Sequence, residues 1–369
     1  MIPFLQLTPG ADRAAIAAAI ARVIDRGWFI LGPELDSFEK AFAAATGASH
    51  AIGVGNGTDA LAIALRAAGI GAGDEVITSP LSAAYTALAI MMVDARPVFA
   101  DIDPIRLTVD PRAAEAVVSP RTTAIIPVHL YGQAADMDGI ATVATRHGLA
   151  LIEDCCQAHL ATCGGRPVGS FGLAAAYSFY PTKNLGALGD GGALTTNDDR
   201  VAAQARRLRN GGQTDRYRHA EFGVNSRLDE LQAAVLAERL RGLAEATRLR
   251  RALAVRYRAG LEGVEAVTVP PELDAGHVYH LFPVLTRNRD ALQDHLTQQG
   301  VETLVHYPVP IPRQPALATE APRQCPIADD VCNRVLSLPL YPSLNPSAID
   351  QVVAAIRSFS MASASLRGC

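Results

Sequence analysis

Lysine is rare in this sequence, and one of its two lysines stands where its amine could react. Of the 33 lysine and arginine residues, only Lys40 and Lys183 are lysines. A guanidinium stays protonated at any working pH, whereas an amine can lose its proton and attack a carbonyl. Lys40 falls in the helical pattern 34–46 and is expected at the surface. Lys183 follows the predicted strand 174–179 in a segment rich in Gly, Ser and Pro, and ligands bind at strand ends in parallel sheets. Carbonyl chemistry at Lys183 competes with the plain alternative of a lysine in a surface loop.

An acidic strand end lies upstream of this lysine. The predicted strand 149–153 is largely apolar and is followed directly by Asp154. A carboxylate there could face the protonated ring nitrogen of pyridoxal phosphate and keep the ring cationic, so that the ring accepts electrons from a carbanion. Gln157 could reach the ring hydroxyl. The alternative for Asp154 is the N-cap of a helix, where aspartate is common.

A glycine-rich turn between a strand and a helix offers a phosphate site. Segment 54–61 reads Val-Gly-Asn-Gly-Thr-Asp-Ala-Leu, and backbone N–H groups at such a helix start hold a phosphate dianion. The hydroxyl groups of Thr58 and Ser178 would add donors. The turn also fits a dinucleotide-binding pattern, which requires an acid at the end of the next strand. Because Asp74 and Glu75 precede that strand instead, the dinucleotide interpretation is rejected.

Short apolar strands that alternate with helices would position these groups. Each predicted strand is nearly all apolar, as expected for a largely parallel sheet covered by helices on both faces. The predicted strands are 50–54, 75–78, 97–100, 124–128, 149–153, 174–179 and 192–196. The predicted helices of this α/β part are 11–25, 34–46, 58–69, 82–93 and 136–147.

A long helical stretch leads out of the α/β part. Leu and Ala recur at helical spacing from 228 to about 261, a pattern that lets a chain leave one domain and enter the next. The remainder predicts a smaller α+β domain, with helices over 289–299, 327–336 and 347–358 and strands over 278–285 and 303–306. The expected division is a large cofactor-binding domain over 1–240 and a small C-terminal domain over 241–369.

Composition indicates an ordered globular protein. The 369 residues are 49% hydrophobic and 19% charged, which allows ample burial. The net charge is −4, and the Arg clusters near 206–218 and 248–258 fall in helical patterns, so we expect no nucleic-acid partner. No apolar stretch is long enough to span a membrane and no signal-peptide pattern is present, so we expect a cytoplasmic protein without a membrane partner. The six cysteines show no C-x-x-C spacing, and reduced thiols and no metal site are expected.

Four segments in a fixed order carry a family resemblance. Segments 55–61, 128–133, 178–186 and 225–232 read Gly-Asn-Gly-Thr-Asp-Ala-Leu, Val-His-Leu-Tyr-Gly-Gln, Ser-Phe-Tyr-Pro-Thr-Lys-Asn-Leu-Gly and Asn-Ser-Arg-Leu-Asp-Glu-Leu-Gln. With these segments, the chain resembles the DegT/DnrJ/EryC1/StrS family of sugar aminotransferases over nearly its whole length. The resemblance implies the aspartate-aminotransferase fold, which is fold type I of the pyridoxal-phosphate-dependent transferases.

The resemblance also implies a role for each residue of the expected site. Lys183 would carry pyridoxal phosphate covalently, Asp154 would pair with the ring nitrogen, and Gln157 would bind the ring hydroxyl. The positions that match the phosphate-binding residues of the family are Gly57, Thr58 and Ser178.

Two further positions follow from the resemblance. Asn225 matches a residue that reaches the phosphate from the neighbouring subunit, which implies a homodimer with shared active sites. By its sequence context alone, Asn225 would pass for a loop or helix-cap residue. The aromatic residue that usually stacks on the cofactor ring is replaced by Ala83 in this chain. Tyr85 is the candidate to take over the stacking, and a different cover of the ring face is the alternative.

The reaction and substrate are inferred from the same resemblance. Some relatives carry His in place of the lysine and catalyse dehydration, so Lys183 favours transamination, with glutamate as the expected amino donor. Segment 305–310 resembles members that aminate C3 of a dTDP-linked 3-keto-6-deoxyhexose, and His306 and Tyr307 would line the sugar site. One alternative is amination at C4 of a dTDP- or UDP-linked 4-keto sugar. The other is amination of a UDP-linked 3-keto sugar. His306 could instead be a packed turn residue, and His159 a hydrogen-bonded core histidine.

The sequence disfavours two function classes outside transamination. A regulator that keeps the cofactor fold without turnover would show a lost lysine or a fused DNA-binding segment, and the sequence shows neither. A nicotinamide oxidoreductase is disfavoured because dinucleotide binding needs an acid at the end of the strand after the glycine turn, whereas Asp74 and Glu75 stand at its start.

Overall fold

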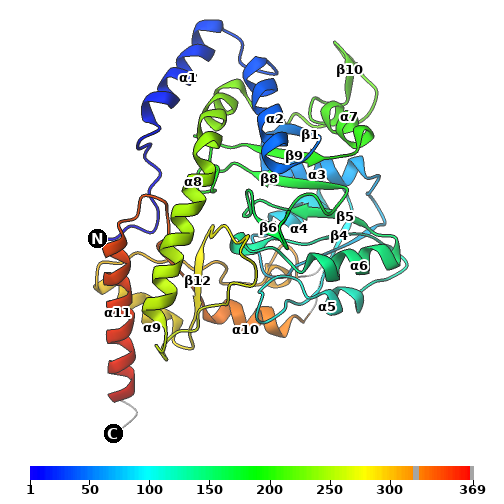
Figure 1. Ribbon diagram of the computed structural model, residues 1–369. Coiled ribbons are helices and arrows are strands. Elements are labelled where there is room, and N and C mark those ends of the chain that lie inside the picture. Colours follow the sequence, from blue (N-terminus) through cyan, green and yellow to red (C-terminus); the bar gives the residue numbers. More distant parts are fainter. Residues whose placement is uncertain (319–323, 366–369) are drawn as a thin grey trace.

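A seven-stranded sheet forms the centre of the larger part of the protein in the computed structural model, which describes residues 1–318 and 324–365 (Figure 1). Its strands are β1 (His50–Val54), β2 (Glu75–Thr78), β3 (Arg96–Phe99), β4 (Thr122–Ile126), β5 (Ala150–Asp154), β8 (Ala174–Ser178) and β9 (Gly192–Thr196). Their order across the sheet is β1-β9-β8-β5-β4-β2-β3. Only β9 runs against its neighbours, and the other pairs are parallel. The predicted α/β class with a mostly parallel sheet is confirmed.

Helices cover both faces of this sheet. One face packs against α3 (Gly57–Ala67), α4 (Tyr85–Met91) and α7 (Asp199–Leu208). The other packs against α2 (Pro33–Thr46), α5 (Pro111–Glu115), α6 (Met137–His147) and the first part of α8 (Glu230–Leu261). Because side chains alternate along a strand, Ile152 of β5 faces the α3 layer while Leu151 faces α6.

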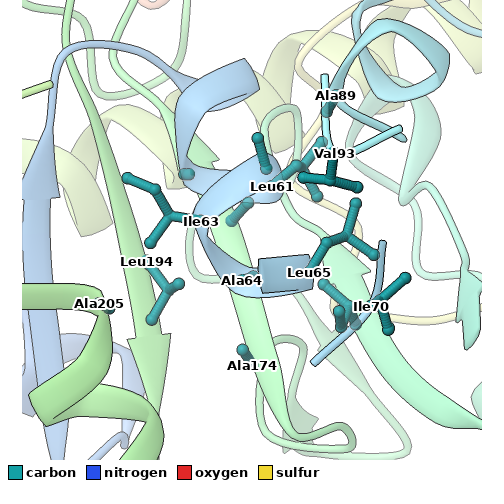
Figure 2. Close-up of a cluster of buried hydrophobic side chains, with 14 of the residues drawn as sticks. Leu61, Ile63, Ala64, Leu65, Ile70, Ala89, Val93, Ala174, Leu194 and Ala205 are labelled. Atoms are coloured by element: carbon teal, nitrogen blue, oxygen red, sulfur yellow. The ribbon is translucent and has the colours of Figure 1, made fainter. Parts of the chain in front are cut away.

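The buried core around α3 supports the glycine turn at the N-terminus of this helix. Figure 2 shows α3 side chains reaching to both sides, with Ile63 toward Leu194 of β9 and Leu61 toward Val93. Leu61 and Ile63 are each 1% exposed. Full burial of such a side chain stabilises the fold by roughly 1.5–3 kcal/mol, so the N-terminus of α3 is held firmly against the strand ends.

The long helix α8 connects this part to the C-terminal part. Its 32 residues extend about 48 Å, and it contacts α1 (Arg13–Arg26) and α2 as well as α11 (Pro346–Ser365). The C-terminal part adds the antiparallel strands β12 (Phe282–Leu285) and β13 (Val335–Leu338) and the helices α9 (Arg289–Gln298) and α10 (Pro326–Arg334). The strands β12 and β13 and the helix α9 share a second buried cluster with α11 and the end of α8, whereas α10 packs in a separate cluster. The domain boundary at 240/241 falls within α8 and stays a prediction.

The remaining elements are short and lie in connections. They are β6 (Thr162–Cys163), β7 (Arg166–Pro167), β10 (Gln213–Asp215), β11 (Arg218–His219) and the 3₁₀ turns η1 (Leu130–Gly132) and η2 (Ile311–Arg313).

Several predicted boundaries are wrong. Segment 303–306 is not a strand, since only Leu304 forms an isolated bridge, with Ser337. The helix predicted over 327–336 ends at Arg334, because Val335 adopts an extended conformation and begins the buried strand β13. The strand predicted over 278–285 is limited to β12, and the helix predicted over 82–93 is limited to α4. Short apolar runs fit either element, so their partners in space decide.

Among the described residues, no helix is long and apolar enough to cross a membrane. Five of the six cysteines are free thiols. The sixth, Cys369, lies outside the described residues.

Candidate active site

The loop after β8 carries Lys183 in a tightly closed turn. The N–H of Ala187 donates to the carbonyl of Phe179 at 2.7 Å, and the N–H of Lys183 donates to the carbonyl of Tyr180 at 2.8 Å. A Cβ atom at Gly186 would lie 2.5 Å from the carbonyl oxygen of Pro181. Only glycine allows this approach, so the loop keeps one shape and holds the lysine in one place.

Lys183 lies in a desolvated and acidic setting. Burial lowers the pKa of the Lys183 amine, while the nearby Cys156 and Asp154 oppose that shift. A lowered pKa increases the fraction of free amine near neutral pH, which is the form that attacks a carbonyl. Lys183 is partly buried, and its role in carbonyl chemistry stays a prediction.

Asp154 ends β5 and is 5% exposed. Its Oδ1 accepts from the N–H of Cys156 at 3.1 Å, and its Oδ2 accepts from the hydroxyl of Thr86 at 2.7 Å. A turn follows Asp154, not a helix, so the N-cap alternative is wrong. Two donors fix the plane of this carboxylate and leave its remaining lone pairs available to a bound group.

Gln157 is oriented by two neighbours. Its Oε1 accepts from the N–H of Tyr131 at 2.8 Å, and its Nε2 donates to the hydroxyl of Tyr307 at 3.0 Å. These bonds fix which end of the amide carries the N–H groups. The second Nε2 hydrogen has no acceptor in the described part of the chain and could donate to a ligand hydroxyl.

The N-terminus of α3 meets β8 and the turn after β5. A Cβ atom at Gly57 would lie 2.8 Å from Sγ of Cys156 and 2.8 Å from Cβ of Ser178. Thr58 is the second residue of α3, and the side chain of Asn56 caps the helix by accepting from the N–H of Asp59 at 2.8 Å. The N–H groups of Gly57 and Thr58, at the positive end of the helix, have no acceptor among the described residues. This cradle fits a phosphate, and the carboxylate and amine nearby fit the ring and aldehyde of pyridoxal phosphate.

Asn225 lies outside this cradle. Its side chain is exposed, whereas the next residue, Ser226, is 3% exposed. The Ser226 hydroxyl accepts from the N–H of Gly55 at 2.9 Å and donates to Oδ2 of Asp59 at 2.6 Å. The segment is thus tied to the glycine turn of its own chain, while the Asn225 side chain is exposed.

Tyr85 and Asp154 both lie near Tyr307. Tyr85 opens α4 and is 64% exposed. Burial raises the pKa of Tyr307 to about 12, and the charges of Asp154 and Tyr85 add to the shift. Both phenol rings therefore border the region that Gln157 and Asp154 line.

His306 precedes Tyr307 and is partly packed. Its ring stacks on Phe4 with centroids 5.6 Å apart, and its Nδ1 lies 3.0 Å from the hydroxyl of Ser337. Burial and the charge of Lys183 lower the pKa of His306 to about 4. His306 is therefore both a packed turn residue and a neighbour of Lys183.

His159 is a histidine of the buried core. It is fully buried between Tyr177 and Phe179. Burial, followed by the charge of Lys183, lowers the pKa of His159 to about 3. A hydrogen bond with the backbone of Ser178 opposes this shift in part, and the side chain is a neutral imidazole beside the lysine loop.

The sequence reasoning missed three contributors. Thr86 binds Asp154, Tyr131 orients Gln157, and Asn184 bridges His280 and the carbonyl of Val278. Tyr131 and Asn184 lie in segments that carried the resemblance, so those segments were the available signal. Thr86 carried no signal, because its partner Asp154 is distant in the chain.

One cluster in the described part of the chain has metal-ligating side chains: His129, Glu153 and Cys155. Glu153 already accepts from the N–H groups of Gly169, Phe171 and Gly172. Nδ1 of His129 accepts from the N–H of Ala135, so its Nε2 donates to Glu153 at 3.2 Å. These bonds use the lone pairs that a cation would need, and the cluster serves to hold the loop 169–172.

The mostly parallel sheet, with the partly buried Lys183 and the carboxylate of Asp154 at its strand ends, is that of an aminotransferase of the α/β class. The chain belongs to the DegT/DnrJ/EryC1/StrS aminotransferase family, whose family model matches residues 11–357. Enzymes of this family depend on pyridoxal phosphate.

Individual relatives cover nearly the whole chain. The chain is 46% identical over 363 residues to a dTDP-3-amino-3,4,6-trideoxy-alpha-D-glucose transaminase of Streptomyces venezuelae, covering 97% of this chain and 96% of the relative. It is 42% identical to a UDP-2-acetamido-2-deoxy-3-oxo-D-glucuronate aminotransferase of Pseudomonas aeruginosa, covering 96% and 99%. The crystal structure of S. venezuelae DesV in complex with a ketimine intermediate matches with a TM-score of 0.93 at 46% identity, covering 97% and 98%.

Proposed function

We propose that this chain is a pyridoxal-phosphate-dependent aminotransferase that converts a nucleotide-linked keto sugar to the amino sugar. The proposed substrate is a dTDP-3-keto-6-deoxyhexose, and the proposed amino donor is glutamate. The observation that carries the proposal is the convergence of Lys183, Asp154 and the Gly57 cradle at one edge of the sheet. These groups match the amine, the ring partner and the phosphate site that such an enzyme requires.

When bound, pyridoxal phosphate supplies an aldehyde for imine formation and a cationic ring that accepts electrons from the substrate carbon. Asp154 accepts the hydrogen bond of the ring N–H and keeps that proton in place. Gln157 donates from Nε2 to the ring hydroxyl. Gly57, Thr58 and Ser178 hold the phosphate.

Lys183 is the proposed acid and base of the reaction. Its Nζ takes the proton from the donor carbon that bears nitrogen, and in the second half returns a proton to the sugar carbon. The lowered pKa of Lys183 suits this role, since a general base works best when its pKa lies near the operating pH. His306 and Tyr307 are proposed to border the sugar, with Tyr85 covering the ring face that Ala83 leaves open.

A homodimer in the cytoplasm is part of the proposal. Asn225 would donate to the cofactor phosphate of the partner subunit, which agrees with its exposed side chain beside the phosphate turn. Tyr180 and Leu188, which flank the lysine loop, are 51% and 43% exposed. A partner subunit would cover these apolar side chains.

The shared site can be tested by mixing two inactive variants, Lys183→Arg and Asn225→Ala. Only the mixed dimer would pair an intact lysine with an intact partner asparagine. About a quarter of the sites should regain activity after subunits exchange in a closed two-fold dimer. No recovery in dimers shown by native mass spectrometry to be mixed would refute site sharing.

The sugar is tested with a substrate panel. The enzyme would be given glutamate and purified 3-keto and 4-keto sugars on dTDP and UDP, and the aminated carbon identified by NMR. The proposal expects the highest kcat/KM for the dTDP-linked 3-keto sugar, as for the relative that is 46% identical. The relative that acts on a UDP-linked 3-oxo sugar supports a UDP-3-keto substrate as the second candidate, and a higher kcat/KM on UDP would establish it.

A further inference from the structure

Two arginines of the described chain are less than 10% exposed, and their charges are compensated differently. Arg209, 7% exposed, is paired through Nη1 with the carboxylate of Glu39. Arg250 on α8 is 4% exposed and has no ion pair with any described carboxylate. A buried charge without a partner is costly, so such groups are normally paired. Arg250 departs from this rule, so a bound anion would compensate its charge.

The hydrogen bonds of Arg250 are incomplete. Its Nη1 donates to the carbonyl oxygens of Tyr279, His280 and Leu340 at 3.2, 3.4 and 2.8 Å. Its Nε is fully buried and has no partner among the described residues. Its Nη2 also donates no hydrogen bond to a described residue, but unlike Nε it is not fully buried. Nη2 is therefore the one part of this guanidinium open to a ligand.

Arg250 remains a cation in this setting. Burial lowers the pKa of Arg250 to about 10, which still leaves the guanidinium protonated at neutral pH. The three carbonyl groups fix its Nη1 edge and set its plane. A fixed planar fork is well suited to a carboxylate.

Arg250 and Lys183 line the same cleft. This cleft, called the α8 cleft here, has a volume of about 470 Å³ and lies between segment 5–12, segment 181–184 and α8. An anion held at Arg250 would therefore lie in a space that Lys183 also borders. The other charged residues of its lining are Asp12, Glu238, Arg239 and Glu245. The neighbouring Arg251 is not among the lining residues, although its Nε also donates to a carbonyl, that of His277, at 2.8 Å.

We propose that Arg250 is the specificity-determining residue that binds a carboxylate of the amino donor. The inference rests on the proposed transaminase function and names the donor contact of that site. In an α-amino acid the transferred nitrogen and the α-carboxylate share one carbon, so that carboxylate must lie near the point where Lys183 acts. The diphosphate of a nucleotide sugar is attached at C1, away from the reacting ring carbon. A carboxylate is therefore the anion that the position of Arg250 favours.

The test compares Arg250→Gln with Arg251→Gln in the cofactor-loaded enzyme. Glutarate, a dicarboxylate without an amine, serves as the probe and is titrated by calorimetry. Arg250→Gln should weaken glutarate binding by at least about tenfold, the usual size of a lost charge-assisted hydrogen bond. Arg251→Gln, on the same helix, should leave it within about twofold. Equal effects of the two substitutions would overturn the proposal.

A second readout separates binding from a structural role. Arg250→Gln should raise the KM for glutamate by at least about tenfold and leave the KM for the keto sugar unchanged. If Arg250 only braces the three carbonyl groups, both KM values and kcat would change together, and the proposal fails. A loss of dTDP affinity with unchanged glutarate affinity would assign Arg250 to the nucleotide and overturn the proposal as well.

The wild-type protein supplies a test that needs no variant to fold. A crystal structure with glutarate should place one carboxylate within hydrogen-bond distance of Nη2 of Arg250. Glutarate bound elsewhere would refute the assignment. If wild-type enzyme transfers no amine to any nucleotide sugar but binds glutarate at Arg250, the proposed sugar function fails and the carboxylate site stands. If amine transfer occurs and Arg250→Gln leaves the glutamate KM unchanged, the function stands and this inference fails.

Discussion

Thr86 donates a hydrogen bond of 2.7 Å to Oδ2 of Asp154, although the two residues are 68 positions apart in the chain. Thr86 lies in α4 and Asp154 ends β5, so the bond joins a helix on one sheet face to the strand end that faces Lys183. Together with the N–H of Cys156 on Oδ1, it leaves the carboxylate little freedom to rotate. The ring partner of the cofactor is thereby set before any ligand binds.

Removing the Thr86 hydroxyl should weaken cofactor binding. Thr86→Val keeps the shape but leaves one oxygen of Asp154 without its donor, which should cost about 1–3 kcal/mol. Equilibrium titration with pyridoxal phosphate should show a higher Kd, and kcat should fall. Thr247→Val is the matched control, because Thr247 is a buried helical threonine whose hydroxyl has no partner. Equal losses in both variants would contradict the role given to Thr86.

The identity of the reactive amine can be tested with the two lysines. Lys183→Arg keeps the positive charge but cannot condense with an aldehyde, so turnover and the visible absorbance of covalently bound pyridoxal phosphate should both disappear. Lys40→Arg should keep both, as Lys40 lies exposed on α2. An unchanged visible band near neutral pH in the Lys183→Arg variant would refute the assignment.

The phosphate cradle predicts a steric effect at Gly57. Gly57→Ala would place a methyl group 2.8 Å from Cys156 and Ser178, so the cradle must open and the affinity for pyridoxal phosphate should fall by more than about tenfold. Gly242→Ala, where nothing lies within 4 Å, should leave the affinity unchanged. That control should also gain about 0.5–1 kcal/mol of stability from helix propensity. Fluorescence titration of the cofactor would decide, and unaltered affinity in Gly57→Ala would remove the cradle from the site.

His159 predicts a loss of stability in acid. Its pKa of about 3 in the folded state lies below the ordinary value of 6.5, so between these values the unfolded chain binds more protons. The free energy of unfolding should therefore fall as pH drops from about 6.5 toward 3, with His159 contributing up to about 1.4 kcal/mol per pH unit.

His159→Phe should reduce that slope, because phenylalanine fits between aromatic rings without a titrating group. Urea unfolding at pH 7, 6 and 5 measures the effect. His219→Gln, at an exposed position on β11, serves as the control and should leave the slope as in the wild type. A His159→Phe protein with the wild-type slope would show that other groups cause the acid sensitivity.

Local pattern was sufficient for most of the sheet. The predicted strands 50–54, 75–78 and 192–196 coincide with β1, β2 and β9, and the other sheet strands shift by only a few residues. Buried strands flanked by helices have a strong apolar signature in sequence. The pattern failed at 303–306 and at β13, where a short apolar run fits either element and pairing with a distant strand decides.

The sequence alone determined the reactive groups and their positions in the chain: a single loop lysine, a strand-end carboxylate and a glycine turn at a helix start. Each of them can be recognised from its neighbours in the chain. Tertiary structure decided which side chains orient these groups, bury them or compensate their charge. Gln157 is turned by Tyr307 from 150 residues away, and Arg250 is isolated from every described carboxylate by its position on α8. Hydrogen-bond direction and burial depend on atoms brought together by folding, and residue type and spacing along the chain do not encode them locally.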